Sequence, residues 1–466
     1  MRTKTFDSKI WHTEAMKSKD FTKNARVSIL TVEIDDFIIE MFENQVLCGL
    51  KYKTTVNAEV GIMNIVKTAY CRIFQQVFHA ALPVLPYRKP EILGNVEELS
   101  NLLVEKGIGC VMLVTDQMIR SCGLTARLEE LLQDREIRCI VYDKTVANPT
   151  TDNVEEALAW YLEEKCEALI GFGGGSSMDC AKAIGARVAR PDKQLDKMEG
   201  ILKVLRPLPL LIAVPTTAGT GSETTLASVI VDSRTRHKYP INDFPLIPRY
   251  AVLDPEVTRS LPPALTATTG MDALTHAVEA YIGRSTTKET RQDAVNAVRL
   301  IFANIRDAYA DGNNMKARKQ MLRAAYLAGN AFTRSYVGYV HAVAHSLGGK
   351  YNTPHGLANA VLLPFVLEAY GQTAFRPLHA LAVAVGISDW RESDEQGAKK
   401  FIEAVRQMKR DLNIGDTIPD IQKKDIPALA RKAEKEANPL YPVPKLMTAK
   451  QLEELYYMVM EEQEYA

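Results

Sequence analysis

Hydrophobic runs and helical periodicities alternate along residues 110–188. Short runs of consecutive apolar residues indicate buried strands, whereas apolar residues at every third or fourth position indicate helices. The predicted strands are 110–115, 137–142 and 168–172, and the predicted helices are 124–133, 154–165 and 178–188. This alternation is typical of a parallel sheet with helices on both faces.

The pattern changes near the pair Pro262-Pro263. Before this pair, a strand at 210–214 runs into a loop rich in threonine and glycine, and a short strand at 251–253 closes the sheet. After it, long Ala-, Leu- and Val-rich stretches such as 293–308 have helical spacing, and strand signals almost vanish. We predict three parts: an N-terminal extension (1–85), an α/β dinucleotide-binding domain (86–262) and an all-α metal-binding domain (263–466).

Composition excludes several classes of protein. Lys plus Arg and Asp plus Glu each number 57, so the net charge is zero and nucleic acid is not an expected partner. No apolar stretch reaches the roughly 18 residues that cross a bilayer, and we expect neither a membrane span nor a targeting peptide. The seven cysteines form no C-x-x-C pair, which indicates reduced thiols and a cytoplasmic protein.

A glycine-rich loop follows the strand at 168–172. Three adjacent glycines, Gly173, Gly174 and Gly175, stand between this strand and the next helix, where bare backbone N–H groups favour phosphate. Their spacing departs from the usual dinucleotide fingerprint. The alternative is a tight turn in which Ser176 or Ser177 is the helix N-cap.

A second such loop, 215–223, follows the strand at 210–214 with the sequence Pro-Thr-Thr-Ala-Gly-Thr-Gly-Ser-Glu. Ligands of open α/β sheets bind where the strands end, so both loops are expected at one pyrophosphate. Asp116 also ends a strand. Its carboxylate is suited to a ribose 2′-hydroxyl and repels a 2′-phosphate, which favours NAD over NADP; the alternative is a helix N-cap.

Histidines cluster in the helical part. Four of the eight, at 276, 341, 345 and 355, fall within an 80-residue stretch of it, and Asp272 is four residues before His276 on the same helical face. Imidazoles and a carboxylate make a mixed N/O site suited to Fe(II), Zn(II) or Mn(II). One carboxylate and three imidazoles leave a position open for substrate, as in catalytic sites. The other four histidines, His12, His79, His237 and His379, are expected to be structural.

Together these segments resemble the iron-containing (group III) alcohol dehydrogenase family, in particular an extended subgroup with an extra N-terminal segment. The resemblance runs from about residue 90 to the C-terminus. It rests on Gly173-Gly-Gly-Ser, the 215–223 loop, Leu253-Asp-Pro-Glu, Gly270-Met-Asp-Ala-Leu-Thr-His and the block 341–359.

The resemblance implies roles for individual residues. It places Asp272, His276, His341 and His355 at the four metal-ligand positions, with Fe(II) as the expected metal, and His345 beside the nicotinamide. The implied NAD(H) contacts are Asp116, Asn148, Gly174, Gly175, Ser176, Asp179, Thr216, Thr217, Thr220 and Lys238. Family habit implies a homodimer or a larger homo-oligomer.

Two features depart from the family pattern. The segment Ile92-Leu-Gly-Asn-Val96 keeps one glycine where family members usually have a Gly-x-Gly turn. Residues before about 85 have no counterpart in the compact members, and their role is open between an oligomer contact, a lid and extra cover for the core.

The expected reaction is hydride transfer between a small alcohol and NAD, with a metal that polarises the substrate oxygen and His345 as a proton relay. One alternative is a sugar-phosphate cyclase, which needs clustered cations; only Arg334 and Lys350 stand near the metal motifs. A second is a non-catalytic protein that keeps metal and nucleotide. A glycerol-type or hydroxyacid-oxoacid dehydrogenase is the third, although the apolar neighbours Val337 and Val340 favour a small uncharged primary alcohol.

Overall fold

The computed structural model describes residues 56–461 and divides into two compact units. The larger unit comprises residues 67–82 and 87–461 of the described chain. His12 lies outside the described residues.

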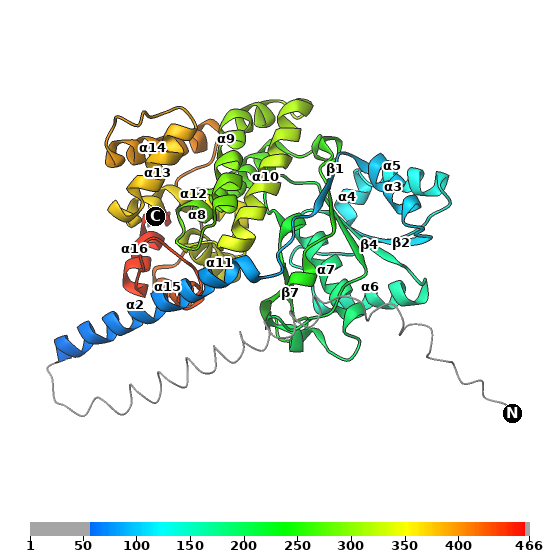
Figure 1. Ribbon diagram of the computed structural model, residues 1–466, viewed down its shortest axis with the longest axis horizontal. Coiled ribbons are helices and arrows are strands. Elements are labelled where there is room, and N and C mark those ends of the chain that lie inside the picture. Colours follow the sequence, from blue (N-terminus) through cyan, green and yellow to red (C-terminus); the bar gives the residue numbers. More distant parts are fainter. Residues whose placement is uncertain (1–55, 462–466) are drawn as a thin grey trace, which may run out of the picture. The chain divides into compact units, whose positions relative to one another are not determined.

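A six-stranded sheet in which all neighbouring strands are parallel forms the centre of the first half of this unit (Figure 1). The strand order is β1-β9-β6-β4-β2-β3. The bounds are β1 Glu91–Leu93, β2 Cys110–Val114, β3 Arg138–Tyr142, β4 Ala168–Gly173, β6 Leu210–Pro215 and β9 Tyr250–Val252.

Helices cover both faces of the sheet because successive strand residues point to opposite sides. In β2, Val111 and Leu113 pack into one buried cluster, and Met112 and Val114 pack into another. The first cluster includes side chains of α3 (Val96–Glu105) and α5 (Ala126–Asp134), and the second includes those of α6 (Thr151–Glu163) and α7 (Gly175–Ala189). The predicted α/β class is confirmed.

Two details of the strand prediction are wrong. The strand at 251–253 does not close the sheet, because β9 lies between β6 and β1, and Glu91 is paired with Tyr250. A separate three-stranded sheet, β5-β8-β7, was not predicted, since its strands are short and only partly buried. Its bounds are β5 Gly200–Ile201, β7 Ala227–Val231 and β8 Lys238–Asn242.

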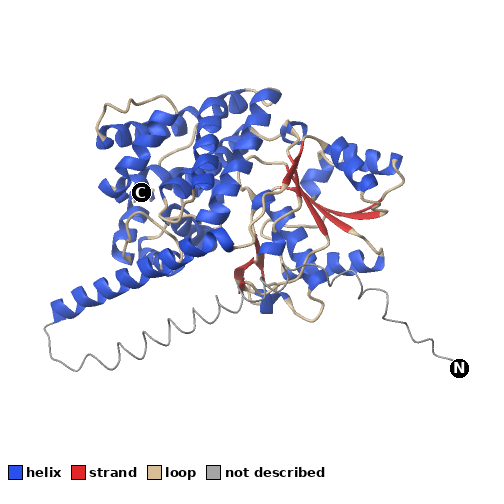
Figure 2. Ribbon diagram, in the orientation of Figure 1, coloured by secondary structure: helices blue, strands red, loops and turns tan. Residues whose placement is uncertain are grey.

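From α8 onward the described chain contains helices and no named strand, as Figure 2 shows. The α-helices are α8 Pro263–Ile282, α9 Lys288–Ala310, α10 Met315–Ser335, α11 Tyr339–Tyr351, α12 His355–Tyr370, α13 Gln372–Ala384, α14 Asp394–Asp411, α15 Ile426–Ala437 and α16 Ala449–Val459. One large apolar cluster holds them together, and most residues of α8 and α12 are buried. The predicted helical half is confirmed.

Two further α-helices and several short turns complete the described fold. They are α2 Val56–Ala81, α4 Gln117–Ser121 and the short 3₁₀ turns, of which η3 Ser222–Thr224 matters for the site. No described helix is long and apolar enough to cross a membrane.

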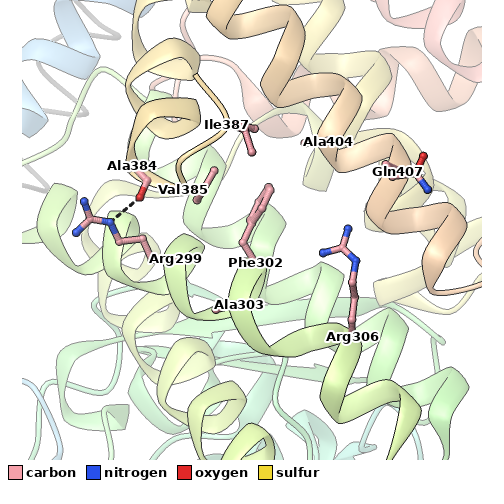
Figure 3. A pocket seen from close by; sticks show the side chains of 9 residues that line it. All are labelled: Arg299, Phe302, Ala303, Arg306, Ala384, Val385, Ile387, Ala404 and Gln407. Atoms are coloured by element: carbon pink, nitrogen blue, oxygen red, sulfur yellow. Dashed lines mark hydrogen bonds between the residues drawn. The ribbon is translucent and has the colours of Figure 1, made fainter. Parts of the chain in front are cut away.

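A surface pocket lies between α9, α14 and the end of α13 (Figure 3). It is lined by Arg299, Phe302, Ala303, Arg306, Ala384, Val385, Ile387, Ala404 and Gln407. None of the residues that the sequence singles out lines it.

Candidate metal centre and cofactor site

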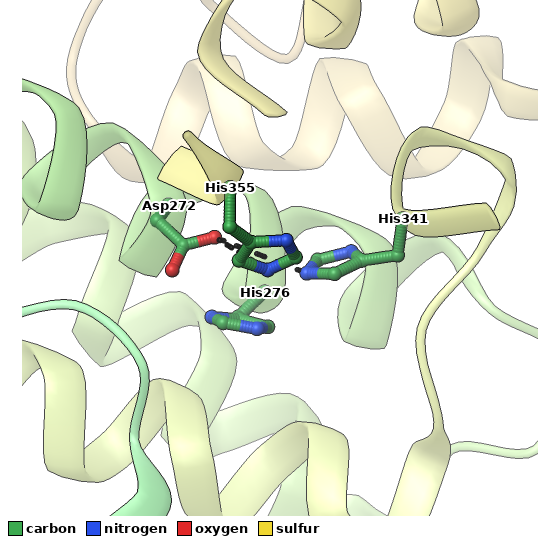
Figure 4. Close-up of side chains that lie close together, drawn as sticks. All are labelled: Asp272, His276, His341 and His355. Carbon is green, nitrogen blue, oxygen red and sulfur yellow. Dashed lines mark ion pairs between the residues drawn. The ribbon is translucent and has the colours of Figure 1, made fainter. Parts of the chain in front are cut away.

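Four side chains from three helices converge in the helical half (Figure 4). Asp272 and His276 lie one turn apart on α8, His341 lies in the first turn of α11, and His355 is the first residue of α12. One ligand atom from each lies within 4.8 Å of the others. The structure thus brings together all four residues at the implied metal-ligand positions.

The cluster is buried on one side and accessible on the other. Asp272, His276 and His341 are at most 4% exposed, whereas the side chain of His355 is 40% exposed. Burial lowers the pKa of His276 and His341, and it lowers the pKa of His355 to about 4. The imidazoles are therefore neutral, which is the form that binds a metal.

The chemistry of this group fits a divalent cation. His276 stacks on Phe332 with ring centroids 4.1 Å apart, and its buried Nδ1 atom has no hydrogen-bond partner among the described residues. Such an orphaned nitrogen is costly unless a ligand pairs it. Three imidazoles and a carboxylate form the N/O set that suits iron(II).

Asn359, one turn after His355 on α12, reaches into the same cluster. Its Nδ2 atom donates to Asp272 Oδ1 at 2.7 Å and lies 3.1 Å from the Nε2 atoms of both His341 and His355. Sequence analysis gave this residue no role, although its four-residue spacing from His355 places both on one helical face.

Glu279 is a second residue that the sequence analysis missed. It is 3% exposed and accepts hydrogen bonds from the backbone N–H groups of Gly338 and Val340, each at 2.8 Å. Its Oε2 atom also lies 2.6 Å from His341 Nδ1. Burial raises the pKa of Glu279, but its three partners are all donors, which an ionised carboxylate accepts best.

His345 lies beside the cluster without adding a ligand atom to it. Its ring centroid is 5.2 Å from that of His355, and its Nδ1 atom is 2.6 Å from Glu436 Oε1. Tyr441 donates to the same Glu436 oxygen at 2.9 Å. Burial acts to lower the pKa of His345, but the charge and hydrogen bond of Glu436 outweigh it and raise the pKa.

The two glycine-bearing loops meet at the ends of the neighbouring strands β4 and β6. A Cβ atom added to Gly174 would lie 3.8 Å from Thr217 Oγ1, and one added to Gly175 would lie 3.3 Å from Thr220. The backbone of Thr216 donates to the carbonyl of Gly173 at 3.0 Å.

The cradle formed by these loops fits a phosphate group. The buried hydroxyl of Thr217 has no partner among the described residues, and it stands beside bare glycine backbone at the start of the 15-residue helix α7. Unpaired donors at a helix N-terminus favour an anion.

Two N-cap interpretations have different outcomes. The N-cap of α7 is Gly174, so the alternative that Ser176 or Ser177 caps this helix is wrong. Asp116 does cap α4, and its Oδ1 atom accepts from Ile119 N at 2.9 Å. Its Oδ2 atom is 3.9 Å from the Cβ position of Gly173, so Asp116 also stands at the glycine loop.

Asn148, Ser176 and Lys238 are brought together at the same edge. Lys238 Nζ donates to Asn148 Oδ1 at 2.6 Å, and Asn148 N donates to Ser176 Oγ at 3.3 Å. Asn148 has a φ of +59°, a backbone conformation that asparagine adopts more readily than most residues.

Asp179 and Lys182 of helix α7 make hydrogen bonds with residues of the second loop and of the segment that follows it. Asp179 accepts from Ser222 Oγ at 2.8 Å and from Val229 N at 3.0 Å. Lys182, which is fully buried, donates to Ser222 Oγ and to Thr225 Oγ1. The sequence analysis missed Lys182, although it lies three residues after Asp179 on one helical face.

The two cations near the metal motifs are engaged elsewhere. Arg334 pairs with Glu289 at 2.6 Å, and Lys350 pairs with Asp425 at 3.5 Å. Neither adds to a cationic cluster at the four converging side chains. These two residues therefore do not supply the clustered cations that a sugar-phosphate cyclase needs.

Comparison with known proteins agrees with this geometry. Residues 92–255 match the model of the family iron-containing alcohol dehydrogenase, and residues 266–460 match the family's C-terminal model. The 1,3-propanediol dehydrogenase of Klebsiella pneumoniae is 38% identical over 368 residues, covering 78% of this chain and 94% of that protein. The chain belongs to the iron-containing alcohol dehydrogenase family.

Other similar proteins and solved structures show the same relationship. Lactaldehyde reductase of Escherichia coli K12 is 35% identical over 73% of this chain and 89% of that protein. The crystal structure of a 1,3-propanediol oxidoreductase has a TM-score of 0.76 at 34% identity, covering 80% of this chain and 98% of that one. Sulfoacetaldehyde reductase from Bifidobacterium kashiwanohense, solved with NAD+, has a TM-score of 0.72 at 26% identity, covering 81% and 99%.

Membership confirms the resemblance, the fold class and the reaction class inferred from sequence. This iron-containing alcohol dehydrogenase is an NAD-dependent oxidoreductase that interconverts a small-molecule alcohol and its carbonyl product, with iron and NAD(H) as cofactors. The sugar-phosphate cyclase and the non-catalytic protein are thereby set aside.

Proposed function

We propose that this enzyme oxidises a small uncharged alcohol, or reduces the matching aldehyde or ketone, at the cluster of Asp272, His276, His341 and His355. The observation that carries the proposal is their convergence from three helices to within 4.8 Å of one another. The accessible side chains of His345 and His355 mark the side from which substrate reaches the cluster, because the other members are buried.

The iron is held by Asp272, His276, His341 and His355. When bound, a divalent metal lowers the pKa of an alcohol hydroxyl and stabilises the resulting negative charge. Glu279 fixes His341 with Nδ1 as the protonated ring nitrogen, which leaves Nε2 free toward the cluster. Asn359 holds the carboxylate of Asp272 in place by donating to Oδ1.

His345 takes the proton that leaves the substrate. Its Nδ1–H donates to Glu436, so Nε2 is the atom with a free lone pair. The negative charge of Glu436 stabilises the imidazolium that forms. The side chain of His345 is 42% exposed, which gives the proton a route onward to solvent.

The loops at the ends of β4 and β6 hold NAD(H). The pyrophosphate and its neighbourhood are contacted by Gly174, Gly175, Ser176, Thr216, Thr217 and Thr220. Asp116 accepts a hydrogen bond from a ribose hydroxyl, and Asn148 and Lys238 complete the site. The expected contact of Asp179 with the cofactor stays a prediction. Both of its oxygens are engaged by Ser222 and Val229, so it and Lys182 shape the second loop.

A small uncharged substrate is supported by two observations. The relatives include enzymes named for 1,3-propanediol and lactaldehyde, both short and uncharged compounds. Glu436 also places a carboxylate next to His345, and its charge repels a substrate that bears a carboxylate of its own. The hydroxyacid-oxoacid alternative is therefore disfavoured.

We also propose the setting in which the enzyme works. Residues 86–262 act as the cofactor domain and residues 263–466 as the metal domain. A cytoplasmic location is supported by the cysteines, since all six in the described part of the chain are free. A homodimer or larger homo-oligomer is supported by the edge strand β1, where Ile92 is 51% exposed.

Substrate profiling tests this proposal. Initial rates with short primary alcohols, propanediols, glycerol and 2-hydroxy acids are compared for the native enzyme and for His345→Ala. We expect short alcohols or diols to be preferred over hydroxy acids and a kcat reduced about 100-fold in the variant. A preference for hydroxy acids overturns the substrate class, and an unchanged kcat overturns the role of His345.

A further inference from the structure

The last turns of α2 donate hydrogen bonds to the loop between α15 and α16. Gln75 Nε2 donates to the carbonyls of Pro439 at 3.0 Å and Tyr441 at 2.8 Å. Arg72 donates to the carbonyls of Val443 at 2.8 Å and Pro444 at 3.1 Å. Two side chains of one helix thus satisfy four carbonyls of residues 438–448, which contain no helix or strand of their own.

This face of α2 is embedded in the rest of the unit. Gln75 is 4% exposed and Cys71 is 2% exposed. The carbonyl of Gln75 also accepts from Ser285 Oγ at 3.4 Å. Because a buried carbonyl without a partner costs about 1–3 kcal/mol, the hydrogen bonds of α2 hold the loop in its observed path.

The loop in turn carries a residue of the site. Tyr441 donates to Glu436 Oε1, which lies 2.6 Å from His345 Nδ1. His345 stacks on His355 at the metal cluster. A continuous set of contacts therefore runs from α2 through the loop to the proposed proton acceptor.

Aromatic rings provide a second route between the same elements. Phe78 of α2 makes an edge-to-face contact with Tyr336, with ring centroids 5.1 Å apart. Tyr336 lies 6.4 Å from Tyr441, centroid to centroid, and it precedes by three residues the helix α11 that bears His341 and His345.

We propose that Arg72, Gln75 and Phe78 of α2 are positioning residues of the active site, which act by fixing the 438–448 loop so that Tyr441 holds Glu436 against His345. They lie before residue 92, where the match to the family model begins. This part of α2 then supports a loop beside the site rather than only covering the core. The expected effect of these residues on turnover rests on the proposed role of His345. Their expected effect on the loop does not.

The test uses the full-length enzyme with volume-conserving substitutions. Gln75→Met removes the amide donor to the carbonyls of Pro439 and Tyr441. Arg72→Met removes the guanidinium donors to the carbonyls of Val443 and Pro444, and Arg72→Lys restores one charged donor. Gln76→Met is the matched control, because Gln76 is the exposed neighbour of Gln75 on the same helix. Amide hydrogen exchange of residues 438–448 is measured together with kcat and KM.

We expect Gln75→Met and Arg72→Met to speed exchange in the loop and to lower kcat about 10-fold, with KM changed by less than about twofold. Arg72→Lys should recover most of the loss, and Gln76→Met should match the native enzyme. In the double variant Gln75→Met with Tyr441→Phe, kcat should fall no further than in Tyr441→Phe alone, because both act through one hydrogen bond.

Unchanged exchange in the loop, or losses that multiply in the double variant, would overturn the inference. If Gln75→Met does not fold, the Arg72→Met and Arg72→Lys pair decides, since only positioning predicts recovery by lysine. If His345→Ala keeps full turnover, the proposed proton transfer fails, whereas faster exchange in Gln75→Met still supports the placement of the loop by α2.

Discussion

The Nδ1 atom of His341 lies 2.6 Å from the Oε2 atom of Glu279, and both side chains are almost completely buried. The contact selects one tautomer of the imidazole. Since Glu279 also accepts from two backbone N–H groups, it is itself held firmly, and the direction of the His341 lone pair is fixed before any metal arrives.

Replacing Glu279 with glutamine should weaken metal binding. The amide carries only one acceptor oxygen for three donors, so His341 loses its defined orientation, and we expect iron(II) affinity to fall about 10- to 100-fold. Competition with a chelator measures the dissociation constant without any turnover. Asp243→Asn is the matched control, since Asp243 also is buried and accepts from two backbone N–H groups but touches no ligand. Equal affinity in Glu279→Gln and Asp243→Asn would contradict this role.

Asn359→Leu should destabilise the metal-free enzyme. The change removes the donor to Asp272 and leaves a buried carboxylate under-satisfied, which costs about 1–3 kcal/mol. Added metal should recover part of this loss because it neutralises the same carboxylate. Denaturant unfolding with and without metal measures both values. Asn330→Leu, at a buried asparagine of α10 outside the cluster, should show a loss that metal does not change.

The sequence predicted the parts of the fold that have strong periodicity. Strands such as 168–172 are buried on both faces and read as continuous apolar runs, and α9 and α10 have amphipathic spacing. The β5-β8-β7 sheet has no such signal, because its strands are short and partly exposed.

The residues of the candidate site likewise fall into those that a sequence pattern indicates and those that it does not. Asp272 and His276 share a helical spacing that sequence alone shows, and Asn359 stands at the same spacing from His355. Glu436 is 91 residues from His345, and no periodicity relates them. Contacts of this kind depend on how α11 and α15 pack, which tertiary structure alone decides.

Cofactor choice provides a further prediction. Asp116→Ser keeps a side chain that can cap α4 but removes the negative charge beside the glycine loop. We expect kcat/KM with NADP to rise relative to that with NAD by about 10-fold or more, because the repulsion of a 2′-phosphate is relieved. Initial rates with both cofactors measure the ratio. A native enzyme that already prefers NADP would refute the role given to Asp116.

The free energy of unfolding should depend on pH through the protonation of Glu223. Burial raises the pKa of Glu223 to about 7 in the folded state, above the ordinary value of 4.5. Between pH 4.5 and 7 the folded chain therefore holds a proton that the unfolded chain has lost, so this residue's contribution to stability falls as pH rises, by up to about 3 kcal/mol.

Comparison with Glu223→Gln isolates this contribution. The free energy of unfolding of both proteins is measured from pH 4.5 to pH 7.5 by denaturant titration. The variant should gain stability relative to the native enzyme as pH rises through this window. A difference that stays constant with pH would mean that Glu223 does not change protonation there.

The central claim is that Asp272, His276, His341 and His355 hold the metal on which alcohol oxidation depends. The most direct measurement is alcohol-dependent NADH formation by anaerobically purified enzyme that is stripped of metal and resupplied with Fe(II), Zn(II) or Mn(II), beside a His341→Ala control. We predict that Fe(II) restores turnover in the native enzyme and not in the variant. Turnover that survives stripping, or that returns equally in His341→Ala, would contradict the account.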